Sequence, residues 1–308
     1  MSTILIGVDA SERSEDAVAF GRRLASASGA HIRLACVFPY DDTPSRAANG
    51  VYREFLAADA ENTVIRQRAA LEDLPAGRVS SCIVANYSPP RALHAICESE
   101  QPAVVVVGST HTGPIGRVTP GSTAERLLHG SPCPVVVVPD GYRTRPEQPI
   151  RRIGVGVDGS TESQAALDAA VELARTLGAH LEIIGVHAAN SYGAPAMMGG
   201  PGYDVVRRDI ERRQKESLAA ALASVRAGAD AEAIALAGDP AERLIERSAQ
   251  LDLLILGSRG YGPLRSVLVG GVSGDVMRGA HCPVIALPRG VKAPLTELFT
   301  ATTSTARP

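Results

Sequence analysis

Two glycine-rich segments contain the residues whose types and spacing could bind a phosphate. In the later segment two residues separate Gly257 from Gly260, and nine more lead to Gly270, Gly271 and Ser273. Glycine lets the backbone approach an anion closely, and free amides at the N-terminus of a following helix donate to phosphate oxygens. The pattern therefore predicts a loop that binds a phosphate-bearing ligand.

The earlier segment repeats this spacing with one substitution. His111 stands in the place of the second glycine, where it either crowds the phosphates or offers them a cation at lower pH. The other members of this loop are Gly108, Gly121, Ser122 and Thr123.

The later loop departs from the same pattern at a different place. Gly271 replaces the hydroxyl residue, so one phosphate hydrogen bond is missing unless Ser273 supplies it. A hydrogen bond to a charged acceptor is worth about 1.5 to 3 kcal/mol, or roughly a ten- to hundredfold change in affinity. We therefore expect both loops to bind, with different affinities.

These loops belong to an internal repeat with an offset of 149 residues. Five landmarks share that register: residues 6–11 with 155–160, 29–31 with 178–180, 108–109 with 257–258, 121 with 270, and 133–134 with 282–283. A polar segment rich in Pro and Gly separates the copies and is typical of a linker. We predict domains at 1–140 and 150–289, followed by a flexible tail at 290–308.

Short β-branched runs alternate with helical patterns in each copy, which predicts an α/β fold with a doubly wound, Rossmann-like sheet of five parallel strands per copy. The predicted strands are 4–8, 32–37, 79–84, 104–107 and 135–138, then 153–157, 181–186, 232–236, 253–256 and 284–287. The later copy is predicted to have helices at 161–177, 204–226 and 240–249, the first of them capped by Ser160. The last strand of each copy would be an exposed edge that needs a partner, either the other copy or a second chain.

In such a sheet a ligand binds outside the carboxyl ends of the strands, where the strand order reverses. Asp9 and Asp158 follow the first strand of each copy, and the glycine loops follow the fourth. Either aspartate could contact a ligand or merely cap the next helix, since Asp favours helix N-termini. His31 and His180 fall at the opposite edge and are predicted not to be ligands.

The spacing of glycines and hydroxyl residues resembles the ATP-binding members of the universal stress protein family, whose fold is adenine nucleotide α-hydrolase-like. The resemblance covers both copies, including the Val-Asp-Gly-Ser opening and the Cys-Pro-Val strand. It implies that Asp9 and Asp158 lie near the ribose or a phosphate-bound Mg²⁺, that Val37 and Val186 lie near the adenine, and that the loops surround the triphosphate. It also implies homodimers that pair their last strands. Arg259 beside the later loop could reach the phosphates, or it is simply a solvated surface residue.

Composition excludes several other classes of function. With 31 basic and 33 acidic residues the net charge is −2, which gives no field that would attract nucleic acid or anionic lipid. No apolar run approaches membrane-spanning length, and no secretory signal precedes the first strand, so we predict a cytoplasmic protein. The five cysteines form no CxxC pair and are expected to be buried and reduced.

The sequence offers a site for a nucleotide but no catalyst, since it has no Ser/His/Asp grouping, metal-ligand helix or Gly-Lys-Ser/Thr motif. Our first hypothesis is a non-enzymatic, ATP-binding regulatory or stress-response module, a homodimer that acts on an unidentified regulatory protein. The alternatives are a slow ATPase or nucleotidyl transferase that holds Mg²⁺ with Asp9 or Asp158, and a scaffold that binds no nucleotide.

Overall fold

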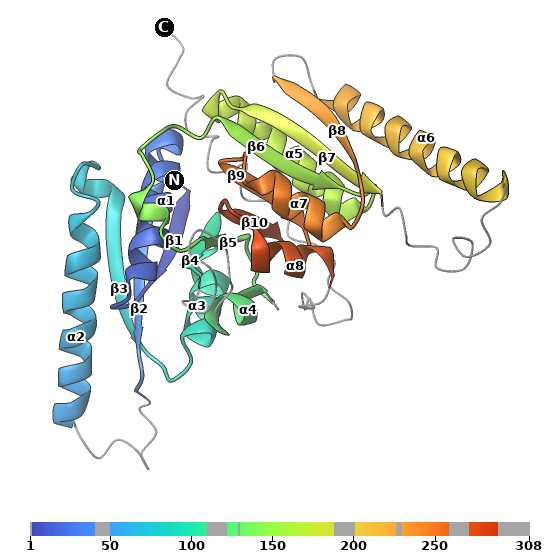
Figure 1. Cartoon of the computed structure of the whole chain (residues 1–308). Coiled ribbons are helices and arrows are strands. Elements are labelled where there is room, and N and C mark those ends of the chain that lie inside the picture. Colours follow the sequence, from blue (N-terminus) through green and yellow to red (C-terminus); the bar gives the residue numbers. More distant parts are fainter. Residues whose placement is uncertain are drawn as a thin grey trace, which may run out of the picture.

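The computed structural model describes residues 2–40, 50–109, 122–128, 130–187, 201–225, 230–258 and 271–288. Within these ranges the strands form one ten-stranded sheet in the order β3-β2-β1-β4-β5-β10-β9-β6-β7-β8 (Figure 1). The two repeats are therefore the two halves of one continuous sheet.

Each repeat has the alternation of strands and helices that the sequence predicts. The first contains β1 (Thr3–Val8), α1 (Glu12–Ser28), β2 (His31–Phe38), α2 (Gly50–Ala69), β3 (Val79–Ala85), α3 (Pro89–Glu100), β4 (Val104–Gly108), α4 (Ser122–Leu128) and β5 (Val135–Val138). The second contains β6 (Arg152–Val157), α5 (Thr161–Leu177), β7 (His180–His187), α6 (Pro201–Ser224), β8 (Ala231–Ala237), α7 (Pro240–Ser248), β9 (Leu253–Gly257), α8 (Val272–Gly279) and β10 (Val284–Leu287). The predicted α/β fold class is confirmed.

The strand order reverses once in each half of the sheet. β1 pairs in parallel with both β2 and β4, and β6 pairs in parallel with both β7 and β9. Side chains of α1, α2, α5 and α6 pack into the core on one face, and those of α3, α4, α7 and α8 into the core on the other. Because helices cover both faces, the inner strands are apolar on both sides, which explains their valine- and isoleucine-rich runs.

The two halves are joined by antiparallel pairing of β5 with β10. Val136 lies opposite Ile285, and Val137 lies opposite Val284. All four residues of each strand are buried. The strand edges that needed a partner therefore satisfy each other within one chain, which was one of the two alternatives left open by the sequence.

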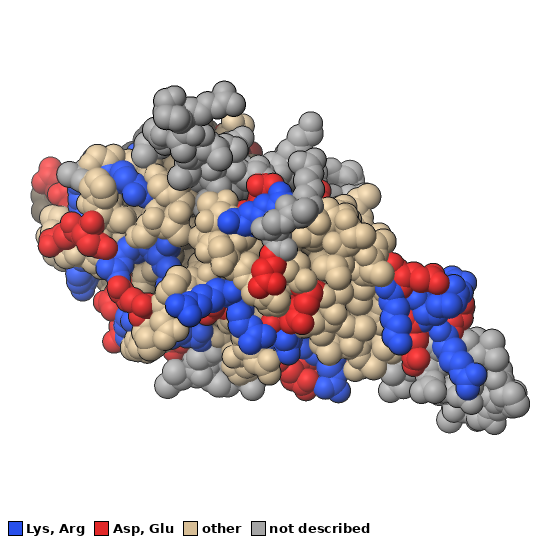
Figure 2. All heavy atoms as spheres, turned by 90° about the horizontal axis from the view of Figure 1, so that it is seen from above, with Lys and Arg blue, Asp and Glu red and all other residues tan. Residues whose placement is uncertain are grey.

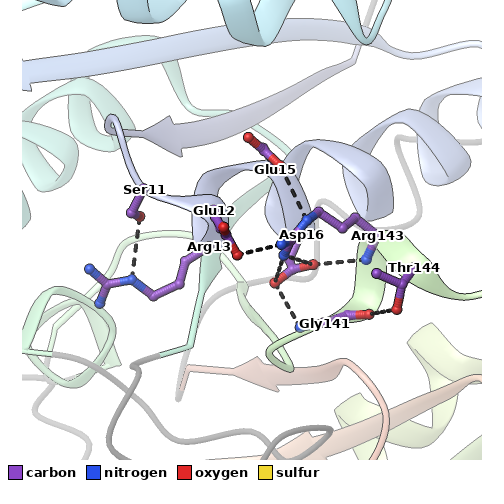
Figure 3. A network of polar contacts seen from close by, with 8 residues as sticks. All are labelled: Ser11, Glu12, Arg13, Glu15, Asp16, Gly141, Arg143 and Thr144. Carbon is purple, nitrogen blue, oxygen red and sulfur yellow. Dashed lines mark hydrogen bonds and ion pairs between the residues drawn. The ribbon is translucent and has the colours of Figure 1, made fainter.

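A buried carboxylate ties the linker to the first helix (Figure 3). Asp16 of α1 is fully buried and accepts hydrogen bonds from the backbone amides of Gly141 at 2.9 Å and Arg143 at 2.8 Å. The Arg143 guanidinium also pairs with Asp16, Glu12 and Glu15. Burial raises the pKa of Asp16, although the hydrogen bonds from Arg143 and Gly141 oppose that effect.

A second buried carboxylate lies in the later repeat, between β6, β7 and α7. Glu182 is fully buried, and its two oxygens pair with Arg152 at 2.5 Å and Arg247 at 2.6 Å. Burial alone would raise the pKa of Glu182, but the hydrogen bonds from Arg247 and Arg152 outweigh it and hold the pKa below its ordinary value. The charge is therefore retained in the fold because two cations compensate its loss of water.

Asp16→Ala should lower the free energy of unfolding by about 3 kcal/mol, because two backbone amides and the Arg143 guanidinium lose their buried acceptor. Asp168→Ala is the control, since Asp168 is exposed on α5 and accepts a hydrogen bond from Gln164 of the same helix. Thermal and urea unfolding measure both. An equal decrease in the free energy of unfolding of the two variants would show that Asp16 does not hold the linker.

The Glu182 site predicts a pH dependence. A carboxylate with a lowered folded pKa adds stability above its ordinary value of 4.5, and that stability is lost as the pH falls through the folded pKa. The melting temperature of Glu182→Gln should therefore lie below that of the native chain at pH 7, and the difference should shrink toward pH 3. Glu172→Gln, at an exposed carboxylate on α5, is the control. A difference that is constant with pH would contradict the prediction.

Candidate nucleotide pockets

Two pockets open at equivalent places, one in each half of the sheet. The pocket of the first repeat has a volume of about 290 Å³ and that of the second about 310 Å³. Each lies at the carboxyl ends of the strands, between the first and fourth strands of its repeat, where the strand order reverses. This is the place at which the fold was expected to bind a ligand.

The second pocket brings together residues from widely separated parts of the repeat. Asp158 follows β6, Val186 is the second-last residue of β7, and Gly257 ends β9. Gly271 and Ser273 line the same pocket from the start of α8. The five described members of the predicted later site therefore share one cavity.

The first pocket repeats this arrangement. Asp9 lines it from the turn after β1, and Val37, Gly108 and Thr123 line it from β2, β4 and α4. Ser122 is the first residue of α4. His111 and Gly121, together with Arg259, Gly260 and Gly270 of the later loop, lie outside the described residues.

Asp9 and Asp158 each organise the turn that leads into the following helix. Oδ1 of Asp9 accepts hydrogen bonds from the Ser11 amide at 2.9 Å, from the Ser14 hydroxyl at 2.9 Å and from the Ser11 hydroxyl. In the second repeat, Oδ1 of Asp158 accepts from the Ser160 amide at 3.0 Å and its hydroxyl at 2.5 Å. Neither carboxylate caps the helix itself, because Ser11 and Ser160 are the N-cap residues, and both carboxylates instead fix the turn that precedes the helix.

The charge on Asp9 is stabilised by the same turn. Burial raises the pKa of Asp9, but the hydrogen bonds from Ser11 and Ser14 and the charge of Arg13 outweigh that effect and lower it. Asp9 is therefore ionised at neutral pH. Helix α5 starts in the same way as α1 but adds the predicted cap, because Ser160 Oγ accepts from the Ser163 amide at 3.2 Å.

The first glycine of each loop has a packing reason of its own. A Cβ atom on Gly108 would lie 2.4 Å from the carbonyl oxygen of Arg13, and one on Gly257 would lie 2.4 Å from that of Glu162. The ends of β4 and β9 thus approach the first turns of α1 and α5 too closely for a side chain. These glycines keep the strand ends and helix starts together, which brings the pocket walls within reach of one ligand.

The sequence suggested that Ser273 could donate a hydrogen bond to a phosphate, but the structure gives its hydroxyl another acceptor. Ser273 Oγ donates to the carbonyl oxygen of Gly257 at 3.0 Å, so its hydrogen already has an acceptor within the protein. Gly271 precedes the helix with φ 125° and ψ 172°, a conformation that is essentially restricted to glycine. Gly271 is thus needed for the backbone turn that begins α8.

Sequence reasoning missed a buried hydroxyl in the first pocket. Ser109 follows β4 and is 1% exposed, and within the described part of the chain its Oγ has no hydrogen-bond partner. The equivalent Ser258, also 1% exposed, lines the second pocket. The Gly-Ser pair that recurs at 108–109 and 257–258 was the available signal.

His31 and His180 begin β2 and β7, at the strand ends opposite the pockets. His31 pairs with Ser80 at 2.7 Å, and His180 with Asp230 at 2.9 Å. Both therefore serve the opposite edge of the sheet. Among the described residues, no cluster of three or more His, Cys, Asp or Glu side chains could hold a metal ion, and no helix is long and apolar enough to cross a membrane.

Comparisons with known proteins agree with this architecture. A model of the universal stress protein family matches residues 1–139 and 149–288. A universal stress protein of Mycobacterium tuberculosis H37Rv is 28% identical over 295 residues, covering 92% of this chain and 95% of that protein. A relative from Mycolicibacterium smegmatis is 28% identical over 294 residues, with the same coverage of both chains. The crystal structure of a universal stress protein from Archaeoglobus fulgidus superposes with a TM-score of 0.68 at 20% identity, covering 94% of this chain and 98% of that one.

Gly271→Ala should destabilise the protein by about 1 to 3 kcal/mol, because a side chain is strained at φ 125°. Gly77→Ala is the matched control, since a Cβ there meets no atom within 4 Å and its φ is not positive. Urea unfolding with circular dichroism measures both. If Gly271→Ala were as stable as the control, the backbone turn before α8 would not be as described.

Proposed function

Because both halves of this chain belong to the universal stress protein family, we propose that its two pockets bind adenine nucleotides, with ATP as the ligand. In this proposal the chain is a nucleotide-dependent regulatory or stress-response module with little or no catalysis. The observation that carries it is the pair of equivalent pockets at the two points where the strand order reverses.

The lining of each pocket matches the parts of a nucleotide. Val37 and Val186 would offer apolar surface to the adenine ring, and Asp9 and Asp158, which line the same pockets, would accept from the ribose hydroxyls. The phosphates would lie at the starts of α4 and α8, where free helix amides favour an anion. We assign His111, Gly121, Ser122 and Thr123 to the first phosphate loop, and Arg259, Gly260, Gly270 and Gly271 to the second.

The buried Ser109 hydroxyl supports this use of the first pocket. A buried hydroxyl without a partner is unfavourable by about 1 to 3 kcal/mol, so its presence in a cavity wall favours a ligand that supplies the missing bond. Ser273 does not take this role in the second pocket, because its hydrogen is donated to Gly257. The two sites should therefore differ in affinity.

Mg²⁺ suits these pockets only as a companion of the nucleotide. Each has one carboxylate, Asp9 or Asp158, and Mg²⁺ is commonly held by one or two carboxylates together with substrate phosphates. The ion would neutralise phosphate charge when bound. The chain itself would contribute a single oxygen ligand and orient it through the turn at Ser11 or Ser160.

The hydrogen bonds that Asp9 and Asp158 already accept favour a binding role over rapid catalysis. Both accept hydrogen bonds that fix a helix start, which suits a fixed ligand contact better than a base that must gain and lose protons. A slow ATPase or nucleotidyl transferase is the second candidate. The non-binding scaffold is less favoured, because the side chains that the structure describes around each pocket leave a cavity there.

We further propose a cytoplasmic homodimer that acts on a regulatory protein. Such a dimer would need a surface other than the last strands, since β5 and β10 pair within the chain. Exposed apolar side chains on α2, Val51, Tyr52 and Phe55, offer one. Nucleic acid is not an expected partner, because basic and acidic groups are interspersed on the face shown in Figure 2 and the net charge is −2.

Isothermal titration of nucleotide-free protein with ATP and Mg²⁺ should give two sites per chain. Gly121→Asp and Gly260→Asp should each weaken the affinity of one site for ATP about tenfold or more, because a carboxylate repels the phosphates. Gly77→Asp, far from both loops in the sequence, is the control. No heat and no thermal stabilisation in the native chain would leave only the scaffold.

Turnover distinguishes the two binding hypotheses. Under the proposed function, phosphate release from ATP is slow and does not depend on Asp158. Rapid release that Asp158→Ala abolishes, with ATP still bound, would favour the enzyme instead.

A further inference from the structure

A third cavity lies at the seam between the repeats, away from both nucleotide pockets. It has a volume of about 490 Å³ and lies between α1, the linker and the end of α5. Ala27, Thr176 and Leu177 line it from the C-terminal ends of these helices, whereas the nucleotide pockets lie at their N-terminal ends. It is therefore a separate site.

Two guanidinium groups in this cavity lie close to the same aromatic ring, that of Tyr142. The central carbons of Arg23 and Arg145 are 5.2 and 5.3 Å from the centroid of Tyr142. Arg23 donates to the Tyr142 hydroxyl at 2.6 Å and to the Pro146 carbonyl at 2.9 Å, and Arg145 donates to the His281 carbonyl at 2.6 Å. All of these acceptors are neutral groups.

Neither guanidinium has a carboxylate partner within the described chain. The other arginines of the cavity do, since Arg22 pairs with Asp73 and Glu147, while Arg143 pairs with three acids of α1. Burial raises the pKa of Tyr142 to about 12, so its phenol carries no charge at pH 7. Asp252 lies nearby, but its Oδ2 accepts from the amides of Arg151 and Arg152.

Two half-buried cations that share one ring repel each other, and an anion between them would remove that repulsion. Apolar side chains of Ala19, Ala27, Pro149, Ile150 and Leu177 form part of the remaining wall, beside two carboxylates, Asp73 and Glu147, that pair with Arg22. A guanidinium binds a carboxylate through two parallel hydrogen bonds, and the hydrogen bonds of Arg23 and Arg145 to described residues occupy only part of their N–H donors. We propose that this seam cavity binds a small carboxylate that has an apolar body, such as an aromatic or branched-chain acid.

Such a ligand would contact both repeats and the linker together. α1 belongs to the first repeat and α5 to the second, and the linker residues Tyr142 and Arg145 lie between them. Binding would therefore stabilise the seam without touching either nucleotide pocket. Carboxylate binding at the seam does not require nucleotide binding, and it is expected even if neither pocket binds ATP.

The test uses benzoate as the carboxylate probe and the full chain, with saturation-transfer NMR and titration calorimetry. Benzoate should bind at one site, and inorganic phosphate, which lacks an apolar body, should bind at least tenfold more weakly. Arg23→Gln and Arg145→Gln should each weaken benzoate binding about tenfold, since each removes a charge-assisted contact. Arg212→Gln, on the exposed face of α6, should leave it unchanged.

A further variant covers the case in which the arginine substitutions disturb the fold. Ala27 is exposed on α1 and lines the cavity, so Ala27→Glu should fold normally and compete for the guanidiniums from within. It should abolish benzoate binding and leave the melting temperature at or above the native value. Absence of benzoate binding to the native chain, or binding that Ala27→Glu leaves unchanged, would overturn the proposal.

Discussion

Backbone hydrogen bonds between β5 and β10 are the interaction on which the arrangement of this molecule depends. Each strand would otherwise be the edge of a five-stranded parallel sheet, and both consist of buried aliphatic residues. Pairing them antiparallel closes both edges at once and makes one sheet from two repeats. The pairing also brings α1 and α5 into the same core, with the linker held against α1 by Asp16.

The pockets follow from strand order in each half of that sheet. Because β1 lies between β2 and β4, and β6 between β7 and β9, the helices leave to opposite faces and open a crevice at each reversal. The tight packing of Gly108 against Arg13 and of Gly257 against Glu162 keeps that crevice narrow. A loop glycine here therefore has two uses, since it allows helix and strand to meet and keeps the pocket floor free of side chains.

Much of the fold could be predicted from the sequence, because a repeat and apolar periodicity are local signals. The bounds of α5, β5 and β10 were predicted to the residue, and the parallel order followed from alternation. Whether the last strands pair within one chain or between two chains could not be predicted, because it depends on how the linker folds back. The buried carboxylates Asp16 and Glu182 were also missed, since their partners are distant in sequence or recognisable only in three dimensions.

The candidate site could also be predicted in part, because its position follows from strand patterns that are local in the sequence. Asp9, Asp158, Val37 and Val186 all lie at or just beyond the carboxyl ends of strands, so their convergence follows from topology. The Ser109 hydroxyl, which has no hydrogen-bond partner among the described residues, and the donation from Ser273 to Gly257 depend on side-chain angles that residue spacing does not determine.

A crystal structure of the chain grown with ATP and Mg²⁺ would show directly whether the two pockets bind nucleotide. We expect one nucleotide in each repeat, with adenine against Val37 and Val186 and phosphates at the starts of α4 and α8. Nucleotide bound elsewhere, or both pockets empty at saturating ATP, would contradict it.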